Sequence, residues 1–235
     1  MKMTMKRKAG LAMTAFVVAA NVPFAMLVET FGYDDVLREP PLEVLAAFNA
    51  GGPQLILIWL AFAVVALSFL LVSAWTGEAV KDAGGRWPQW AAAAGAASAV
   101  AQAVGLSRWV FVAPVLADQA LSGDPATSAA AIVFYQGLHQ FAGVGIGEWL
   151  GQTLLAAWTL GFGLTLLKGG AWSKVLGGIG LILTPLWIVG HAELLASVDP
   201  GFPDLQIAQW VFSGWLAWLL AVGLTWSLGR TTKSG

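Results

Sequence analysis

The chain contains no cysteine and little charge: Asp, Glu, Lys and Arg make up 11% of its 235 residues, against 58% hydrophobic residues. The absence of cysteine excludes disulfides, thiolate metal sites, iron–sulfur clusters and covalently attached haem, because each requires sulfur. Soluble proteins average about 25% charged residues, so the composition indicates a protein whose main solvent is lipid. The sequence also lacks a phosphate-binding loop, a G-x-S-x-G elbow and an H-E-x-x-H pair. Most Lys and Arg residues occur in short clusters beside the apolar segments, which excludes a basic face for nucleic acid.

Six apolar stretches are each long enough to cross a bilayer, which takes about 20 helical residues. They cover approximately residues 9–28, 53–75, 90–116, 146–167, 175–195 and 207–228. Helices are expected, because an open sheet edge in lipid would leave backbone groups unpaired. We therefore predict an all-α, polytopic membrane protein, a six-transmembrane-helix bundle that forms one integral-membrane domain over residues 1–235.

The basic residues are divided unequally between the two sides of these stretches. Ten of the twelve Lys and Arg residues lie in the amino terminus, the 76–89 loop, the 168–174 loop and the carboxyl tail, and only Arg38 and Arg108 lie opposite. Because cytoplasmic loops carry the excess of Lys and Arg, both termini are predicted to be cytoplasmic. A signal peptide cleaved after Ala20 is the rival interpretation, although the apolar run continues to Val28.

The first outer loop carries signals of a short helix. The prolines at 40–41 suit a helix start and the glycines at 51–52 suit its end. Leu42, Leu45 and Phe48 repeat between them at helical spacing. We expect a short amphipathic helix that lies on the outer membrane surface or caps the bundle.

Ionisable residues of three predicted helices collect near one depth. At about 1.5 Å of rise per residue, Arg108, Glu148 and His191 lie roughly 26–30 Å from the inner interface, with Glu193 slightly higher. Charged groups inside spans are costly and mark functional sites by default. Structural explanations stay open: Arg108 extending to the headgroups, or Glu148 and Glu193 pairing with Arg108.

Residues 130–146 are too apolar for a solvated stalk. A straight helix would place His139 about 43 Å above Lys168, outside the membrane. The glycines at 143, 145 and 147 permit a bend, so we expect residues 130–146 to fold back and bring Gln136 and His139 to the level of Arg108. Gly143, Gly147 and Gly151 at four-residue spacing also predict a helix-packing face.

Three stretches occur together in this chain: Tyr33-Asp34-Asp35-Val36-Leu37-Arg38-Glu39-Pro40, Gly105-Leu106-Ser107-Arg108-Trp109-Val110-Phe111, and His139-Gln140 through Gly147-Glu148. In these stretches the chain resembles a family of bacterial multi-pass inner-membrane proteins catalogued only as a domain of unknown function. The resemblance implies a bacterial inner-membrane protein and carries no activity with it.

The favoured function is non-enzymatic: a permease-like or sensory bundle with a polar, ligand-binding pocket near the outer interface. The candidate ligand-binding residues are Arg108, Trp109, Gln136, His139, Glu148, His191 and Glu193. The arginine fork suits an anionic or polar group, and a half-buried histidine can titrate near neutral pH. Trp109, Trp149 and Trp187 are expected to line the pocket. The expected partners are the bilayer and an unidentified small molecule or lipid, and homo- or hetero-oligomers stay open.

Three alternatives accompany this prediction. His139 and His191 would hold one haem b in a membrane redox protein. A His–Glu–Arg set, or a zinc ion on both histidines and a glutamate, would make an interfacial lipid enzyme. The third alternative is a structural or accessory subunit.

Overall fold

The computed structural model describes residues 3–33, 35–83, 85–199, 201–203 and 205–229, and this part of the chain contains helices and no strand. The predicted all-α class is therefore confirmed. Four residues of the sequence patterns above lie outside the described residues: Lys2, Asp34, Arg230 and Lys233.

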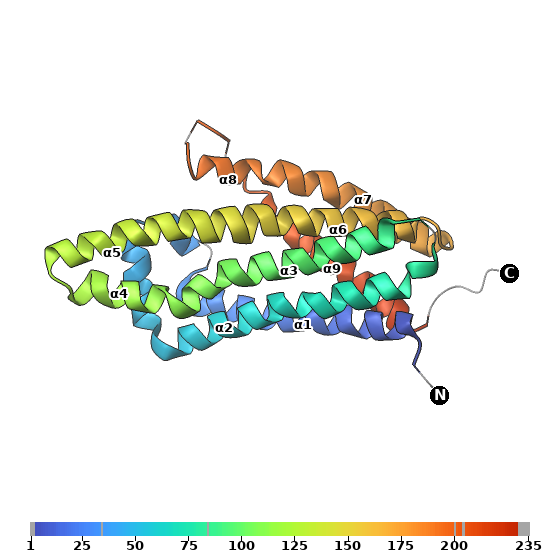
Figure 1. The fold of residues 1–235 in the computed structure, drawn as a ribbon, viewed down its shortest axis with the longest axis horizontal. Helices are drawn as coiled ribbons and strands as arrows, with labels where there is room; N and C mark the ends of the chain where they lie inside the picture. The colour runs from blue at the N-terminus through green and yellow to red at the C-terminus, as the bar shows by residue number, and fades with distance from the viewer. Residues whose placement is uncertain (1–2, 34, 84, 200, 204, 230–235) are drawn as a thin grey trace. The chain divides into compact units, whose positions relative to one another are not determined.

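Figure 1 shows the helices in chain order. They are α1 (Met5–Phe31), the 3₁₀ turn η1 (Asp35–Arg38), α2 (Pro41–Ala79), the 3₁₀ turn η2 (Lys81–Ala83), α3 (Trp87–Phe111), α4 (Ala113–Ser122), α5 (Pro125–Leu138), the π-helix η3 (His139–Leu150), α6 (Gly151–Leu166), α7 (Ala171–Gly190), α8 (Ala192–Ala196) and α9 (Ala208–Ser227).

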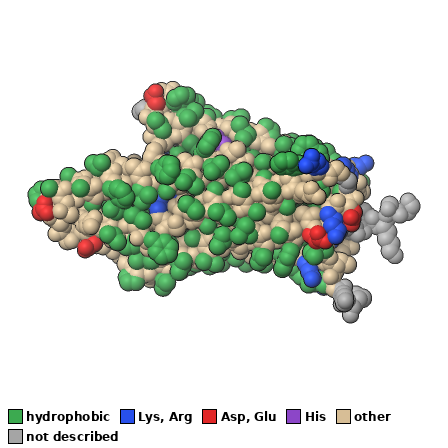
Figure 2. Space-filling model, viewed as in Figure 1, with side chains coloured by type: hydrophobic (Ala, Val, Ile, Leu, Met, Phe, Trp, Pro, Cys, Tyr) green, Lys and Arg blue, Asp and Glu red, His purple; other side chains and the backbone are tan. Residues whose placement is uncertain are grey.

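Five helical segments of the described chain are long and apolar enough to cross a membrane. They are Met5–Phe31, Pro41–Ala79, Trp87–Ser122, Ala171–Ala196 and Ala208–Ser227. Apolar side chains are spread over the face drawn in Figure 2, as expected where lipid is the solvent. The chain is a multi-pass membrane protein. The predicted span 146–167 is helical as well, but its α-helical part, α6, has only 16 residues because a π-helix precedes it.

The expected bend at residues 143–147 is not present. Helical hydrogen bonding continues from Pro125 through η3 to Leu166, and the glycines lie in a π-helix, where each bond spans one residue more than in an α-helix. Helix α4 packs against α5, where the Ser128 hydroxyl donates to the Ala120 carbonyl at 2.7 Å and Ala131 is buried. The glycines therefore permit close packing of the backbone and do not reverse the chain.

The chain divides into two compact units. Unit 1 comprises residues 1–18, 68–100 and 149–235, and unit 2 comprises residues 19–67 and 101–148. Helices α1, α2 and α3 contribute residues to both units. The assignment of residues 1–235 to one domain stays a prediction.

Unit 1 has a core rich in tryptophan and phenylalanine, and two of its buried indole groups are hydrogen-bonded to α6 and α7. Trp215 donates to the Thr159 hydroxyl at 3.0 Å, and Trp218 donates to the Leu176 carbonyl at 2.7 Å. Both rings also contact Trp158, with centroids 6.2 and 6.1 Å apart. A buried N–H without a partner is costly, so these bonds avoid that cost for two buried indole groups of unit 1.

Several segments that carry basic residues meet at one end of unit 1. Lys168 Nζ donates to the Ala83 carbonyl at 3.0 Å, which joins the 168–174 loop to η2. Trp172 at the start of α7 donates to Thr225 in the last turns of α9 at 3.1 Å. The first turns of α1 pack on the same part of α9, since a Cβ built on Gly10 would lie 2.6 Å from the Ser227 nitrogen.

Helices α6 and α7 approach each other at glycines, and two adjacent glycines of α7 provide a test. A Cβ at Gly177 would lie 2.7 Å from the Gly163 carbonyl oxygen, whereas one at Gly178 would meet nothing within 4 Å. We expect Gly177→Ala to destabilise the protein by about 1–3 kcal/mol through overpacking. Gly178→Ala should stabilise it by about 0.5–1 kcal/mol, because alanine favours helix. Unfolding of both variants in one detergent, followed by circular dichroism, checks this; equal effects would contradict the packing.

Unit 2 contains the predicted short helix. Helix α2 begins at Pro41, and Gly52 inside it adopts a non-helical, left-handed φ of 56°, so both predicted boundaries are confirmed. The buried face differs from the prediction. Val44, Leu45 and Phe48 are 0–2% exposed, whereas Leu42 is 42% exposed. The three buried residues pack into the aromatic core of unit 2.

Candidate functional site

Within unit 2, the end of α3 and all of α4 pack along α5 and η3. Three contacts show that these two segments run antiparallel, because the residue number rises along α3 and α4 while it falls along η3 and α5. The contacting pairs are Gly105–Gly147, Arg108–Gly143 and Ala120–Ser128. We call this contact line the α3–α5 seam.

Arg108 is buried in this seam, with 7% of its surface exposed. Its Nη1 donates to the Gly105 carbonyl, and its Cζ lies 5.1 Å from the centre of the Trp109 ring. A Cβ at Gly143 would lie 2.6 Å from the guanidinium carbon, so a larger residue at this position would require the Arg108 side chain to shift. Arg108 therefore does not extend to lipid headgroups. Glu148, half-buried in η3, interacts with it electrostatically.

Four buried nitrogen atoms of unit 2 have no hydrogen-bond partner among the described residues. They are Trp59 Nε1, Arg108 Nε, Trp109 Nε1 and His139 Nδ1. The first three can only donate, and the imidazole nitrogen can donate or accept according to its tautomer. We call these four residues the donor cluster.

Ring contacts connect the members of the donor cluster. Trp59 and Trp109 stack with centroids 4.9 Å apart and an interplanar angle of 13°. Trp109 meets His139 edge to face at 6.3 Å. The ring centroids of Tyr135 and His139 lie 5.6 Å apart, and those of Tyr33 and Trp59 lie 5.4 Å apart. Both tyrosines interact electrostatically with Arg108. The cluster therefore forms one aromatic site with an excess of N–H donors.

Two residues proposed from the sequence lie on the surface. Gln136 is exposed on α5, and Trp149 is 54% exposed. Trp59, by contrast, was absent from the sequence-based candidates. Its one signal is its position inside an apolar span, away from the interfaces where tryptophan is usually enriched.

His191 and Glu193 belong to unit 1, at the junction of α7 and α8. His191 Nδ1 lies 3.5 Å from the Thr153 hydroxyl, and its buried Nε2 has no hydrogen-bond partner in the described chain. Trp187 nearby donates to Gln152 at 3.1 Å. The predicted set of site residues is thus divided: Arg108, Trp109, His139 and Glu148 lie in unit 2, and His191 and Glu193 lie in unit 1. The described residues include no group of three His, Asp or Glu placed to hold a metal ion.

A family model described as "Domain of unknown function (DUF4386)" matches residues 8–228. The chain belongs to this family. The resemblance predicted from the three sequence stretches is confirmed, and every candidate site residue lies inside the matched region. No curated protein matches the chain, and no solved structure matches it. The DUF4386 family description names no activity, so the function is argued from the geometry of the site.

Glu193 of this DUF4386 chain caps the start of α9. Its carboxylate accepts from the backbone N–H groups of Ile207 and Ala208, the latter at 3.2 Å. Because loss of a helix cap costs about 0.5–2 kcal/mol, Glu193→Ala should accelerate hydrogen exchange at these two amides. Glu193→Gln keeps an acceptor oxygen and should largely restore protection. Unchanged exchange in the alanine variant would contradict the cap.

Proposed function

We propose that this DUF4386 protein is a multi-pass membrane protein that binds a small ligand non-enzymatically at the donor cluster. The observation that carries the proposal is the imbalance in the cluster: three donor-only nitrogens are buried without an acceptor. An unmade hydrogen bond of a buried group costs about 1–3 kcal/mol. A ligand with acceptor oxygens would recover this free energy, whereas a cationic donor group would not.

The charges around the donor cluster favour a ligand head that is uncharged or carries a single negative charge. The positive charge of Arg108 already interacts with Glu148. A dianionic head would bring a second negative charge beside Glu148 in a buried site, where an uncompensated charge is costly. Carbonyl, ester or single carboxylate oxygens are therefore the ligand chemistry that this site suits best.

The proposed orientation has six membrane crossings with both termini in the cytoplasm of a bacterial cell. The basic segments that meet at one end of unit 1, joined by Lys168 and Trp172, support a common cytoplasmic side. We assign the fourth crossing to residues 146–167, although its α-helical part is short. The helix that begins at Pro41 is proposed as an outer cap over the core of unit 2 rather than as a surface helix, because Leu45 and Phe48 are buried.

Three amphiphiles built on twelve-carbon chains, with different heads, test the ligand chemistry: methyl dodecanoate, dodecanoate and dodecyltrimethylammonium. A ligand at a hundred times its Kd stabilises a protein by about 2.7 kcal/mol. We expect the ester to raise the Tm most, the carboxylate less and the ammonium compound not at all.

Two variants and one control make this test specific. Arg108→Met removes the donors and keeps an unbranched apolar side chain, and His139→Phe removes the imidazole while keeping a ring; both should abolish the Tm increase. Arg38→Met, at an exposed arginine paired with Asp35 at 3.0 Å, should retain it. Equal Tm shifts for all three heads, or in all variants, would overturn the proposal. A Soret band in the purified protein, lost in His139→Phe, would instead establish the haem b alternative.

A further inference from the structure

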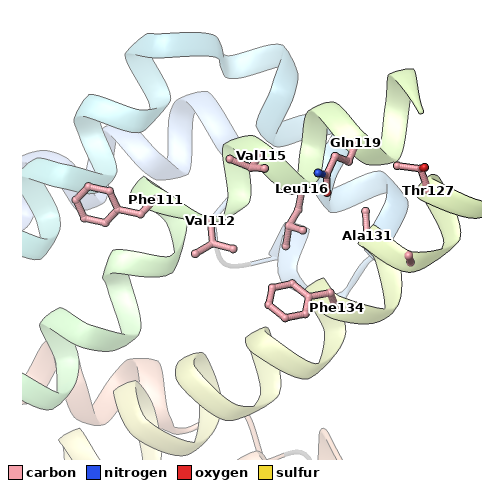
Figure 3. Close-up of a pocket in the computed structure, with 9 residues that line it drawn as sticks. Phe111, Val112, Val115, Leu116, Gln119, Thr127, Ala131 and Phe134 are labelled. Carbon is pink, nitrogen blue, oxygen red and sulfur yellow. The ribbon is translucent and has the colours of Figure 1, made fainter. Parts of the chain in front are cut away.

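An apolar groove runs between α4 and α5 in unit 2. It encloses about 510 Å³. Its lining residues are Phe111, Val112, Val115, Leu116, Gln119, Thr127, Ala130, Ala131 and Phe134. Figure 3 shows the side chains of Val112, Leu116 and Phe134 pointing into the space between the two helical segments. Seven of the nine lining residues are apolar, and the two polar ones lie near the α4–α5 turn.

The groove continues the α3–α5 seam from the donor cluster. Val112 follows Arg108 by four residues, so the two lie on one face of their helical segment. On the opposite segment, Ala131 precedes Tyr135 by four residues, and Tyr135 precedes His139 by four. The apolar lining therefore begins about one helical turn from Arg108 on one side of the seam and two turns from His139 on the other.

We propose that the groove holds the apolar tail of the ligand whose acceptor head binds the donor cluster, so that the ligand is a single-tailed, lipid-like amphiphile. This inference rests on the proposed function. A tail fits the groove because its lining is apolar, and a head fits the seam because the unpaired N–H groups of Arg108 and Trp109 lie there. A purely polar solute would leave the groove without a partner, and a pure hydrocarbon would leave the donors unpaired.

The length of the groove limits the tail. The groove lining on this side runs from Phe111 to Gln119, about 12 Å along a helix, and the span from Arg108 to Gln119 is about 16 Å. An extended chain of roughly a dozen carbons spans a comparable length, given carbon–carbon bonds of about 1.5 Å. The polar side chains of Gln119 and Thr127 mark the far end of the groove.

Two neighbouring alanines of α5 allow a matched test. Ala130 lines the groove and is exposed, whereas Ala129 is exposed and does not line it. Ala130→Trp should fill the groove without entering the core, and Ala129→Trp adds the same ring to the same helix outside it. With the full chain in lipid nanodiscs, the affinity for tritiated methyl dodecanoate is measured by equilibrium binding.

We expect Ala130→Trp to weaken binding about tenfold or more, a loss that corresponds to about 1.4 kcal/mol. Ala129→Trp should stay close to the unsubstituted protein. If Arg108→Met abolishes binding while Ala130→Trp and Ala129→Trp behave alike, the donor cluster binds a ligand whose tail lies elsewhere, and the groove inference is overturned. If neither Arg108→Met nor Ala130→Trp changes binding, the inference and the proposed function both fail. Circular dichroism of each variant confirms that it is folded.

Discussion

Replacing Gly105 with alanine should destabilise this protein more than the other glycine-to-alanine substitutions proposed for it. A Cβ at Gly105 would lie 2.6 Å from the Gly147 Cα and 3.0 Å from the Ala142 carbonyl oxygen. Both obstacles are backbone atoms, so a rotamer change cannot relieve the overlap and the two helical segments must separate. Overpacking of a close-packed interior costs about 1–3 kcal/mol, and we expect the upper end of that range or more.

Gly137→Ala is the matched control for this prediction. Gly137 lies in α5, within the same unit, and a Cβ there would meet nothing within 4 Å. Its replacement should stabilise the protein by about 0.5–1 kcal/mol. Reversible unfolding in mixed micelles measures both free energies of unfolding. A Gly105→Ala variant as stable as Gly137→Ala would contradict the close approach of the segments at Gly147.

Gly143→Ala should displace the Arg108 guanidinium, because the new methyl group would lie 2.6 Å from its Cζ and from its Nη2. Arg108 is 7% exposed and has little room to move, so we expect a loss of about 1–3 kcal/mol of stability. The cause can be isolated with a double-mutant cycle. In an Arg108→Ala background the added methyl group has space, and Gly143→Ala should then cost little.

The expected coupling between the two substitutions is about 0.5–3 kcal/mol, the range for residues in direct contact. Additive free energies of unfolding would show that Gly143 does not accommodate Arg108. Ligand binding provides a second readout: Gly143→Ala should weaken binding of methyl dodecanoate even under conditions where the variant is fully folded.

The elements that depend on local sequence were predictable. The Pro40–Pro41 and Gly51–Gly52 pairs gave the correct limits of the short helix, because proline and glycine restrict or permit backbone angles whatever surrounds them. The membrane-spanning character followed from the length and hydropathy of the apolar runs. These signals require no knowledge of which residues are in contact.

The elements that depend on long-range packing were less accessible. Leu42 fits the helical spacing of Leu45 and Phe48, yet the aromatic core of unit 2 covers Val44 in its place. The π-helix at residues 139–150 changes which side chains share a face, and a period of 3.6 residues cannot anticipate that.

The site residues differ in the same way: local sequence signals identify some of them, and long-range contacts determine the others. The estimate of depth from helical rise grouped Arg108 and Glu148 with His191 and Glu193, which belong to the other compact unit. Depth does not determine which way a side chain faces, and Glu193 turns to cap α9. Only its stacking on Trp109 identifies Trp59 as a residue of the site. This contact joins residues 50 positions apart in the sequence.

We propose that a ligand supplies the hydrogen-bond acceptor that the buried N–H groups of the donor cluster lack. NMR of the indole N–H groups tests this directly. Protein labelled with ¹⁵N at the tryptophan indole gives one N–H signal per tryptophan, and Trp59→Phe and Trp109→Phe assign the two that matter. Saturating methyl dodecanoate should shift at least one of these signals downfield, as a new hydrogen bond forms. The hydrogen-bonded indole of Trp215 should stay in place. If the Trp59 and Trp109 signals are unmoved while the ligand is bound, the donor cluster is not the binding site.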